Sequence, residues 1–227
     1  MDSQLDRVCR AYDLTVEQHR KGVNPLDDIP QDIRDSPFYQ SLTGDSGSPG
    51  SGAPDVREYL APAPGMRFLD AGCSANLVNY RLDRWPSTYY GIDISPRLIE
   101  AMQRFADRER ISTRGLHVAE VARMPFADGF FDIGAAIGVL EYCTLEYVGE
   151  ALSELHRVLK ADARLVLDIP NRDHPHAGYM ARLEAHQDRP IFLHARLDFE
   201  RLLKPLFSQD RVDDSRVMVK YFVRRRK

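Results

Sequence analysis

Hydrophobic positions change their spacing repeatedly along the chain after residue 55. Short apolar runs between turn residues predict β-strands, whereas apolar positions three or four residues apart predict amphipathic helices. The clearest helix spans residues 145–159, where Val148, Leu152 and Leu155 share one face. The predicted helices are 5–19, 55–60, 75–82, 96–108, 145–159 and 199–206. The predicted strands are 66–71, 88–92, 116–120, 131–139, 163–169, 209–213 and 217–223.

The alternation of these strands and helices predicts an α/β fold. Successive strands joined through helices make right-handed crossovers, which give a mainly parallel sheet. We expect a Rossmann-like, doubly wound sheet of seven strands whose last two form an antiparallel hairpin through Asp213, Asp214 and Ser215. Ser95 is the predicted N-cap of the helix that begins at Pro96. Because ligands of such folds bind beyond the carboxyl ends of the strands, residues directly after strands are the candidate site residues.

The N-terminal part of the chain, residues 1–54, is polar and predicts a helical or irregular lid over a domain formed by residues 55–227. Residues 25–37 contain three prolines and predict an irregular connection. Residues 44–52 are rich in glycine and serine, which predicts a mobile loop. A second long polar segment, residues 173–196, is also expected to be a loop.

The composition narrows the class of protein. With 227 residues, of which 43% are hydrophobic, the chain is long enough to build one substantial core. A formal net charge of -3 gives no general attraction to nucleic acid, and the basic residues 224–227 are expected to be a solvated chain end. No apolar run approaches the ~18 residues of a membrane span. The spacing of the three cysteines fits neither a disulfide framework nor a metal site, so we expect a cytoplasmic protein; they are Cys9, Cys73 and Cys143. We expect it to be a monomer or a homodimer.

Two acidic residues follow the first two predicted strands of the domain. The first strand ends in Asp70, Ala71, Gly72 and Cys73, and an acid followed by small residues lets a ligand approach the backbone closely. The second strand ends at Asp93, about 20 residues after the glycine turn. That spacing is typical of an acid that accepts hydrogen bonds from ribose hydroxyls. The turn lacks the Gly-x-Gly-x-x-Gly pattern of NAD-binding dehydrogenases, so a nucleotide-containing ligand of another kind is expected.

Four further motifs follow along the chain. They are Glu120 with Val121, Met-Pro-Phe at residues 124–126, Asp-Gly-Phe-Phe-Asp at 128–132 and Arg-Val-Leu-Lys at 157–160. With these motifs the chain resembles the class I methyltransferases that use S-adenosylmethionine (SAM), in particular the small-molecule group called methyltransferase type 11. The resemblance runs from residue 56 to residue 171. It implies that Asp70 and the glycine turn bind the methionine part of SAM, that Asp93 binds ribose and that Glu120 and Val121 contact adenine. The full set implied for the cofactor is Asp70, Ala71, Gly72, Cys73, Ser74, Asn76, Asp93, Ile94, Glu120, Val121 and Ile137.

The glycine turn departs from the family pattern at two positions, because Ser74 and Asn76 stand where glycine is usual. Serine is small and asparagine tolerates left-handed backbone, so the turn is still expected to form. Both side chains also carry groups that can hydrogen-bond a carboxylate. The alternative interpretation is a regulatory or catalytically inactive protein that binds SAM without turnover.

The resemblance implies a small-molecule methyl acceptor, and the sequence gives a weaker signal for its site. Methyl transfer needs a general base only when the acceptor must lose a proton, and His174 can accept one near neutral pH. His174 and His176 could also be metal ligands or ordinary loop histidines, but no third ligand is visible, so no metal site is predicted. Tyr12 shares a helix face with Leu5 and Val8 and is the preferred lid residue. The predicted acceptor-binding residues are Tyr12, His19, Tyr39, Tyr142, Asn171 and His176.

Overall fold

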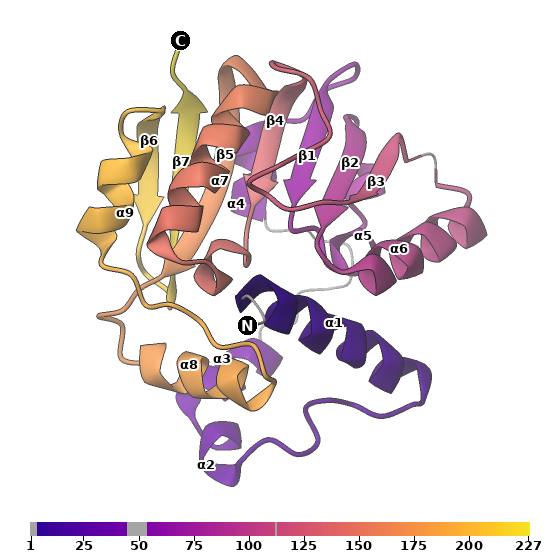
Figure 1. Ribbon diagram of the computed structural model, residues 1–227, viewed down its shortest axis with the longest axis vertical. Helices are drawn as coiled ribbons and strands as arrows, with labels where there is room; N and C mark the ends of the chain where they lie inside the picture. Colours follow the sequence, from indigo (N-terminus) through magenta and orange to yellow (C-terminus); the bar gives the residue numbers. More distant parts are fainter. Residues whose placement is uncertain (1–3, 45–53, 112) are drawn as a thin grey trace.

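A seven-stranded sheet forms the centre of the protein (Figure 1). The computed structural model describes residues 4–44, 54–111 and 113–227. The strand order is β3-β2-β1-β4-β5-β7-β6, in which all pairs from β3 to β5 are parallel and β7 is antiparallel to both of its neighbours. The strands are β1 (Arg67–Ala71), β2 (Thr88–Asp93), β3 (Gly115–Val118), β4 (Phe131–Ala136), β5 (Leu159–Pro170), β6 (Phe207–Asp213) and β7 (Met218–Arg225). The predicted doubly wound sheet with its C-terminal hairpin is confirmed.

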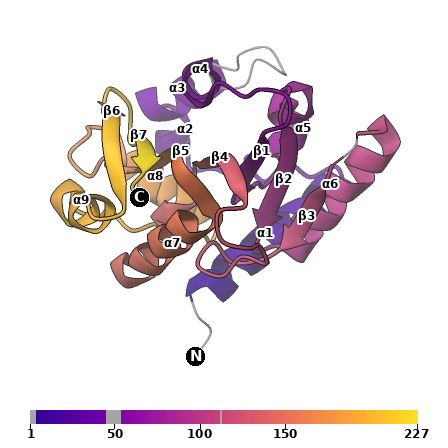
Figure 2. The same cartoon turned by 90° about the horizontal axis from the view of Figure 1, so that it is seen from above.

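Helices cover both faces of this sheet (Figure 2). The α-helices of the domain are α4 (Pro54–Leu60), α5 (Asn76–Tyr80), α6 (Pro96–Glu109), α7 (Leu145–Val158), α8 (Ala177–His186) and α9 (Arg196–Leu203). Neighbouring strand residues point to opposite faces, as in any pleated strand. Phe68 of β1 packs in a hydrophobic cluster with residues of α4, α5 and α6, whereas Leu69 packs in the cluster that contains α7 and α9. The predicted N-cap Ser95 accepts a hydrogen bond from the backbone N–H of Leu98 at 3.0 Å.

The N-terminal helices lie at the edge where the parallel strands end (Figure 1). Helix α1 (Gln4–Arg20) packs against α6, and Ser95 Oγ donates to Asp13 Oδ1 at 2.5 Å. Helices α2 (Gln31–Arg34) and α3 (Pro37–Gly44) pack with α8 around a third hydrophobic cluster. Residues 45–53, most of the predicted mobile loop, lie outside the described residues. A division of the chain at residue 54 stays a prediction, and α4 begins at Pro54 itself.

The predicted loops were wrong in two places. Residues 173–196 contain α8, because Ala177, Met180 and Leu183 recur at helical spacing and are buried in the third cluster. Residues 25–37 contain the short helix α2, whose Ile33 is buried in the same cluster. The two helices pack against each other in this cluster. The polar composition of their segments led to the prediction of loops. Helices α2 and α8 therefore replace the expected loops, and with α1 and α3 they form a helical layer, here called the cap.

Several element ends also differ from the prediction. Strand β4 ends at Ala136, three residues early, because Gly138 takes a positive φ of 70° and a 3-10 helix (η2, Leu140–Tyr142) follows. Helix α5 ends at Tyr80 because Arg81 adopts the left-handed conformation, and a second 3-10 helix (η1, Leu82–Arg84) continues the chain. Strand β5 begins at Leu159, directly after α7, instead of at residue 163. Helix α9 begins at Arg196 instead of residue 199, and β3 ends at Val118 instead of residue 120.

Candidate active site

Two neighbouring cavities lie at the carboxyl edge of the sheet, where the strand order reverses between β1 and β4. Counting the part that is open to solvent, they enclose about 530 Å³ and about 910 Å³. Four residues line both of them and mark their junction: Tyr12, Gly72, Ser74 and Gly138. Ligands of doubly wound sheets bind at this switch point.

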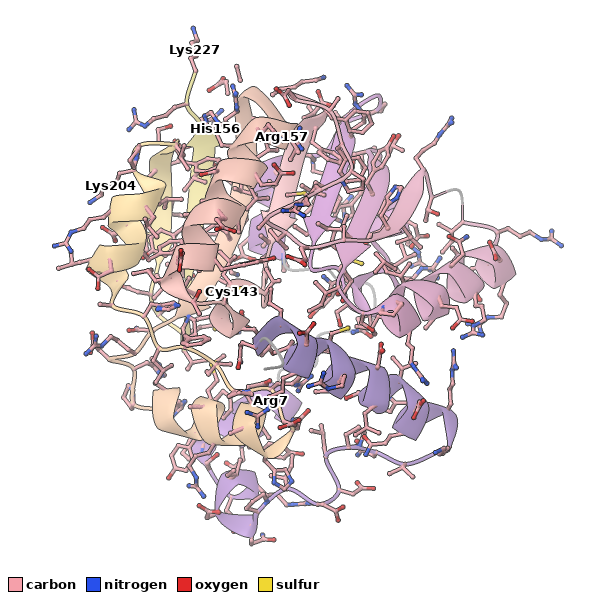
Figure 3. All side chains as sticks on the ribbon, viewed as in Figure 1. Arg7, Cys143, His156, Arg157, Lys204 and Lys227 are labelled. Carbon is pink, nitrogen blue, oxygen red and sulfur yellow. The ribbon has the colours of Figure 1, made fainter. Side chains whose placement is uncertain are left out.

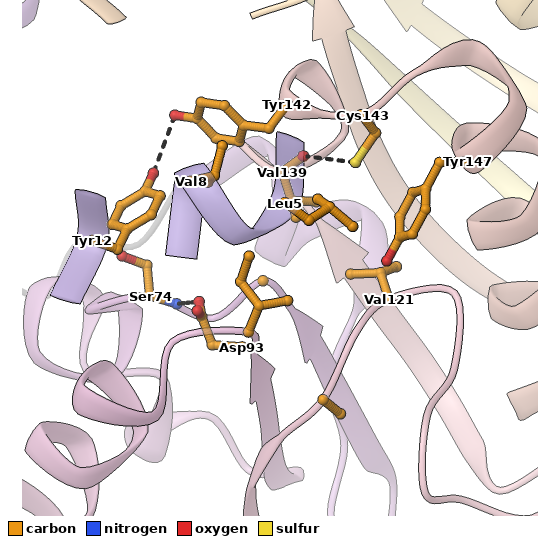
Figure 4. Close-up of a pocket in the computed structure, with 14 residues that line it drawn as sticks. Leu5, Val8, Tyr12, Ser74, Asp93, Val121, Val139, Tyr142, Cys143 and Tyr147 are labelled. Atoms are coloured by element: carbon orange, nitrogen blue, oxygen red, sulfur yellow. Dashed lines mark hydrogen bonds between the residues drawn. The ribbon is translucent and has the colours of Figure 1, made fainter. Parts of the chain in front are cut away.

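Asp93 ends β2 and lines the smaller cavity (Figure 4). It is buried, and each of its carboxylate oxygens accepts one backbone hydrogen bond, Oδ2 from Ser74 N at 2.8 Å and Oδ1 from Ser95 N at 2.9 Å. Burial raises the pKa of this carboxyl above its ordinary value. Each oxygen keeps a second lone pair, so Asp93 can accept two further hydrogen bonds from a ligand.

The turn after β1 forms despite the missing glycines. The N–H groups of Gly72 and Cys73 both donate to Ile92 O, at 2.9 and 2.8 Å. Gly72 and Ser74 adopt positive φ values of 74° and 38°. A Cβ atom on Gly72 would lie 2.6 Å from Val139 Cγ2, so this turn packs directly on the segment that follows β4. The turn is tight, and only glycine fits at residue 72.

Asp70 and Asn76 form a polar group at the wall of the larger cavity. Asn76 Nδ2 donates to both oxygens of Asp70 at 3.2 Å, and Tyr89 Oη donates to Asp70 Oδ2 at 2.8 Å. Burial raises the pKa of Asp70 to about 6 in spite of these bonds. Trp85 lies across the same cavity and stacks on Phe68 with ring centroids 5.0 Å apart. The larger cavity therefore combines one buried acid with aromatic walls.

The remainder of the smaller cavity is mainly apolar. Ile94, Ala119, Val121 and Val139 lie at or just beyond the strand ends, and Leu5 and Val8 of α1 close the cavity from the opposite side (Figure 4). A flat, weakly polar ring fits such a slot better than a charged group. Glu120 instead lines an adjoining groove with Cys9 and Val118, where it accepts a hydrogen bond from Tyr147 Oη at 3.4 Å.

Tyr12 connects the cap to the cavity junction. Its hydroxyl lies 3.1 Å from that of Tyr142 (Figure 4), and Tyr142 donates to Glu184 Oε2 at 3.0 Å. The guanidinium of Arg189 lies 4.6 Å from the centre of the Tyr12 ring and pairs with Glu184 at 3.1 Å. Burial raises the pKa of Tyr12 to about 12, so this hydroxyl stays neutral near pH 7. Four residues from α1, η2, α8 and the segment after α8 thus hold α1 closed over the junction.

The structure brings most of the predicted cofactor residues to these cavities. Those that line one or both cavities are Asp70, Gly72, Ser74, Asn76, Asp93, Ile94, Val121 and Ile137. Ala71 and Cys73 are buried beside them and line neither cavity. Among the predicted acceptor residues, Tyr12 and Tyr142 line the smaller cavity, whereas His19, Tyr39, Asn171 and His176 line neither.

His174 also lines neither cavity. Its Nδ1 accepts the backbone N–H of His176 at 3.1 Å, and the two rings pack 5.0 Å apart. The pair lies at the start of α8, where His176 also packs against Phe38 of α3. Among the described residues, no group of three or more His, Cys, Asp or Glu side chains is placed to hold a metal ion.

Sequence reasoning missed several residues that line the cavities. Gly138 and Val139 were assigned to the last two positions of a strand, so their place in the cavity lining was not expected. Val56, Leu82 and Trp85 line the larger cavity from segments with no motif. One sequence pattern could have identified part of this lining: the apolar face of the first helix, which groups Leu5 and Val8 with Tyr12.

The model of the methyltransferase domain family matches residues 69–167, which contain β1, β2, β4 and both strand-end acids. Residues 69–167 therefore match the methyltransferase domain family, as the sequence predicted. The predicted fold is confirmed by the sheet. Within this methyltransferase domain, the cavities lie where the matched segment meets α1.

Individual relatives agree with this assignment. The chain is 34% identical to a ubiquinone biosynthesis O-methyltransferase of Methylocella silvestris, over 38% of this chain and 34% of that protein. The chain spans between a third and about two fifths of the length of the curated relatives that it matches. The shared part is the methyltransferase domain, so the substrates of these relatives do not transfer to this chain.

Two solved structures share the fold over nearly the whole chain. Magnesium protoporphyrin IX methyltransferase from Synechocystis PCC 6803, solved with bound SAM, has a TM-score of 0.66 at 16% identity and covers 99% of this chain and 98% of its own. The cyclase SpnF has a TM-score of 0.68 at 15% identity and covers 96% and 95%. At such identities the likeness shows the fold alone.

The basic C-terminus lies at the end of the sheet opposite the cavities: Figure 3 places Lys227, His156 and Arg157 there, and Cys143 beside α1. No helix in the described ranges is long and apolar enough to cross a membrane.

Proposed function

We propose that the chain is a SAM-dependent methyltransferase that acts on a small-molecule acceptor. The observation that carries this proposal is the position of Asp93: a buried acid at the end of β2, directly beside the tight turn of Gly72 and open to an apolar slot. This arrangement supports binding of a nucleoside, and the methyltransferase domain supports SAM as that nucleoside.

The residues present fit the cofactor across both cavities. The two free lone pairs of Asp93 suit the two ribose hydroxyls, and the slot formed by Ile94, Ala119 and Val121 suits adenine. The polar group of Asp70 and Asn76 suits the methionine end in the larger cavity. Tyr12 and Gly138, which line both cavities, would then contact the part of SAM between its ribose and its methionine end.

Bound SAM supplies a methyl group that is already activated on a sulfonium sulfur. The chain aligns the cofactor with the acceptor and shields the reacting atoms from water. Strand ends fix the positions of Asp70 and Asp93, and the turn at Gly72 closes the floor against Val139. Helix α1 covers the junction and excludes water, which strengthens each polar interaction inside.

The acceptor is expected at the junction on the side of the cap. Tyr12 and Tyr142 lie there, so we propose them as acceptor-facing residues. A role for His174 as the base requires a movement of α8, since His174 lines neither cavity. As part of the same proposal, we expect a cytoplasmic monomer or homodimer that does not act on nucleic acid. The three free cysteines support the compartment, and the net charge of -3 supports the expectation about nucleic acid.

Calorimetric titration of SAM into the purified chain tests this proposal. We expect micromolar binding in the wild type and a loss of at least about tenfold in Asp93→Ala, because two hydrogen bonds to a charged group contribute about 1.5 kcal/mol or more each. Asp28→Ala is the control, since Asp28 is exposed and lines neither cavity. A folded wild-type chain that does not bind SAM would sink the proposal. Binding then justifies a screen of methyl acceptors with radiolabelled SAM, and the absence of any methylated product would favour the binding-only alternative.

A further inference from the structure

The two hydrogen bonds that hold the Asp93 carboxylate come from two different segments. Oδ2 accepts Ser74 N from the turn after β1, and Oδ1 accepts Ser95 N from the connection between β2 and α6. The turn after β1 is held from within the sheet domain, by its backbone bonds to Ile92 O and its packing on Val139. The connection between β2 and α6 has a different support, which comes from the cap.

Helix α1 of the cap is bonded to the connection between β2 and α6 at three residues. Asp13 of α1 accepts two hydrogen bonds through Oδ1, from Ser95 Oγ at 2.5 Å and from Arg97 N at 3.4 Å. Cys9, one turn earlier, donates from Sγ to Ile94 O at 3.3 Å. The position of this connection, and with it the donor that Asp93 needs, therefore depends on α1.

Ser95 is the residue that joins the two acids. Its backbone N–H donates to Asp93 at 2.9 Å, and its hydroxyl donates to Asp13. The hydroxyl oxygen also accepts Leu98 N at 3.0 Å, as the N-cap of α6. Ser95 is completely buried, so a hydroxyl that lost its acceptor there would be an unsatisfied polar group inside the protein. One buried serine thus links Asp93 to the helix that covers the cavity.

Arg97 attaches α1 to α6 at a separate point. Glu17, one helical turn after Asp13, pairs with the guanidinium of Arg97. Asp13 Oδ2 lies 3.8 Å from Nε of the same guanidinium. These ion pairs involve neither Ser95 nor Asp93. The attachment of α1 to α6 and the support of Asp93 can therefore be changed separately, through Glu17 and through Asp13.

We propose that Asp13 is a positioning residue for Asp93: by fixing Ser95, it holds the Asp93 carboxylate in the orientation that binds the ribose of the cofactor. This inference rests on the proposed function. The bonds from Ser74 N and Ser95 N together fix the plane of the carboxylate, whose remaining lone pairs face the cavity that Asp93 lines. Without Asp13 the connection gains freedom, and part of the binding free energy is then spent on ordering it.

A double-mutant cycle on SAM binding, measured by calorimetric titration, tests this inference. Asp13→Ala should weaken SAM binding by about fivefold in the wild-type background, the effect of about one lost hydrogen bond. In the Asp93→Ala background the same change should weaken binding by less than about twofold, because the carboxylate that Asp13 positions is absent. A residue that only fastens α1 over the cavity would give equal losses in both backgrounds. Equal losses, or no loss in either background, would overturn the inference.

Two further variants test whether the hydrogen bond or the charge of Asp13 is responsible. Asp13→Asn keeps an Oδ1 acceptor for Ser95, so its affinity for SAM should stay within about twofold of the wild type. Glu17→Gln is the matched control, because it removes one negative charge from the same face of α1 and weakens only the pair with Arg97. It should also stay within about twofold of the wild type. A loss in either variant as large as that in Asp13→Ala would contradict the inference.

Failure to fold and failure to bind have different consequences. If Asp13→Ala does not fold, Ser95→Gly takes its place in the cycle, because it removes the same hydrogen bond and keeps the backbone N–H that Asp93 accepts. Glycine is also a tolerated N-cap. A wild-type chain that does not bind SAM, or an Asp93→Ala chain that binds it as well as the wild type, contradicts the proposed function, and the inference falls with it.

Discussion

The floor of the candidate site and the cap above it are built in different ways. The floor consists of strand ends and one tight turn, whose key residues, Asp70 to Asp93, lie within one short stretch of sequence. The contacts between the cap and η2, by contrast, join three segments that lie far apart in the sequence, through Tyr12, Tyr142, and Glu184 with Arg189. The floor can therefore bind a common cofactor with local geometry, while the cap can vary with the acceptor and still close over it.

Breaking the buried ion pair of the cap should have the largest effect. Arg189→Met leaves Glu184, whose side chain is 16% exposed, without its cation, and removal of one member of a largely buried pair costs about 3 kcal/mol. We expect hydrogen exchange to accelerate in α1 and α8 and to change little in β1 and β4. The control is Arg201→Met, which breaks an exposed pair with Asp198 and should cost less than about 1 kcal/mol in denaturant unfolding. Equal losses in both variants would show that the cap does not depend on this pair.

Damage to the floor should have the next largest effect. In Gly72→Ala the new Cβ meets Val139 Cγ2 at 2.6 Å, and alanine must also adopt a φ of 74°. The two penalties together should lower the free energy of unfolding by about 2 kcal/mol and weaken SAM binding. Gly178→Ala is the matched control, because Gly178 lies in α8 with no atom within 4 Å of its Cβ position. That variant should be neutral or slightly more stable. A neutral Gly72→Ala would mean that the turn can relax.

The smallest expected effect concerns the hydrogen bond between floor and cap. Tyr12→Phe and Tyr142→Phe each remove one hydroxyl of the 3.1 Å contact. We expect Tyr12→Phe to cost about 1 kcal/mol of unfolding free energy, and SAM should dissociate faster because α1 opens more readily. A double-mutant cycle measures the coupling between the hydroxyls. A coupling near zero would indicate that this hydrogen bond does not help to hold α1 in place.

The difference between the floor and the cap also explains which features could be predicted from the sequence. The acids Asp70 and Asp93 were predictable because a strand, a turn and a fixed spacing are all local patterns. The turn was predicted to form with Ser74 in it, and it does, with Ser74 at a positive φ. The fold followed from the alternation of strands and helices, since that alternation leaves few possible topologies.

The cap could not be predicted in the same way. Helix α8 was taken for a loop because residues 173–196 as a whole are polar and rich in histidine and arginine, although three apolar residues of α8 are buried. The pairing of Glu184 with Arg189 and Tyr12 depends on how α1 and α8 meet in space, and no spacing in the sequence encodes that meeting.

Trp85 has a practical consequence for work on this protein. It is the single tryptophan of the chain, it stacks on Phe68 and it lines the larger cavity. All indole emission of the protein therefore originates at the wall of that cavity. A molecule that enters it should shift or quench this fluorescence, so unlabelled protein can report in real time which compounds enter the larger cavity and how fast they leave.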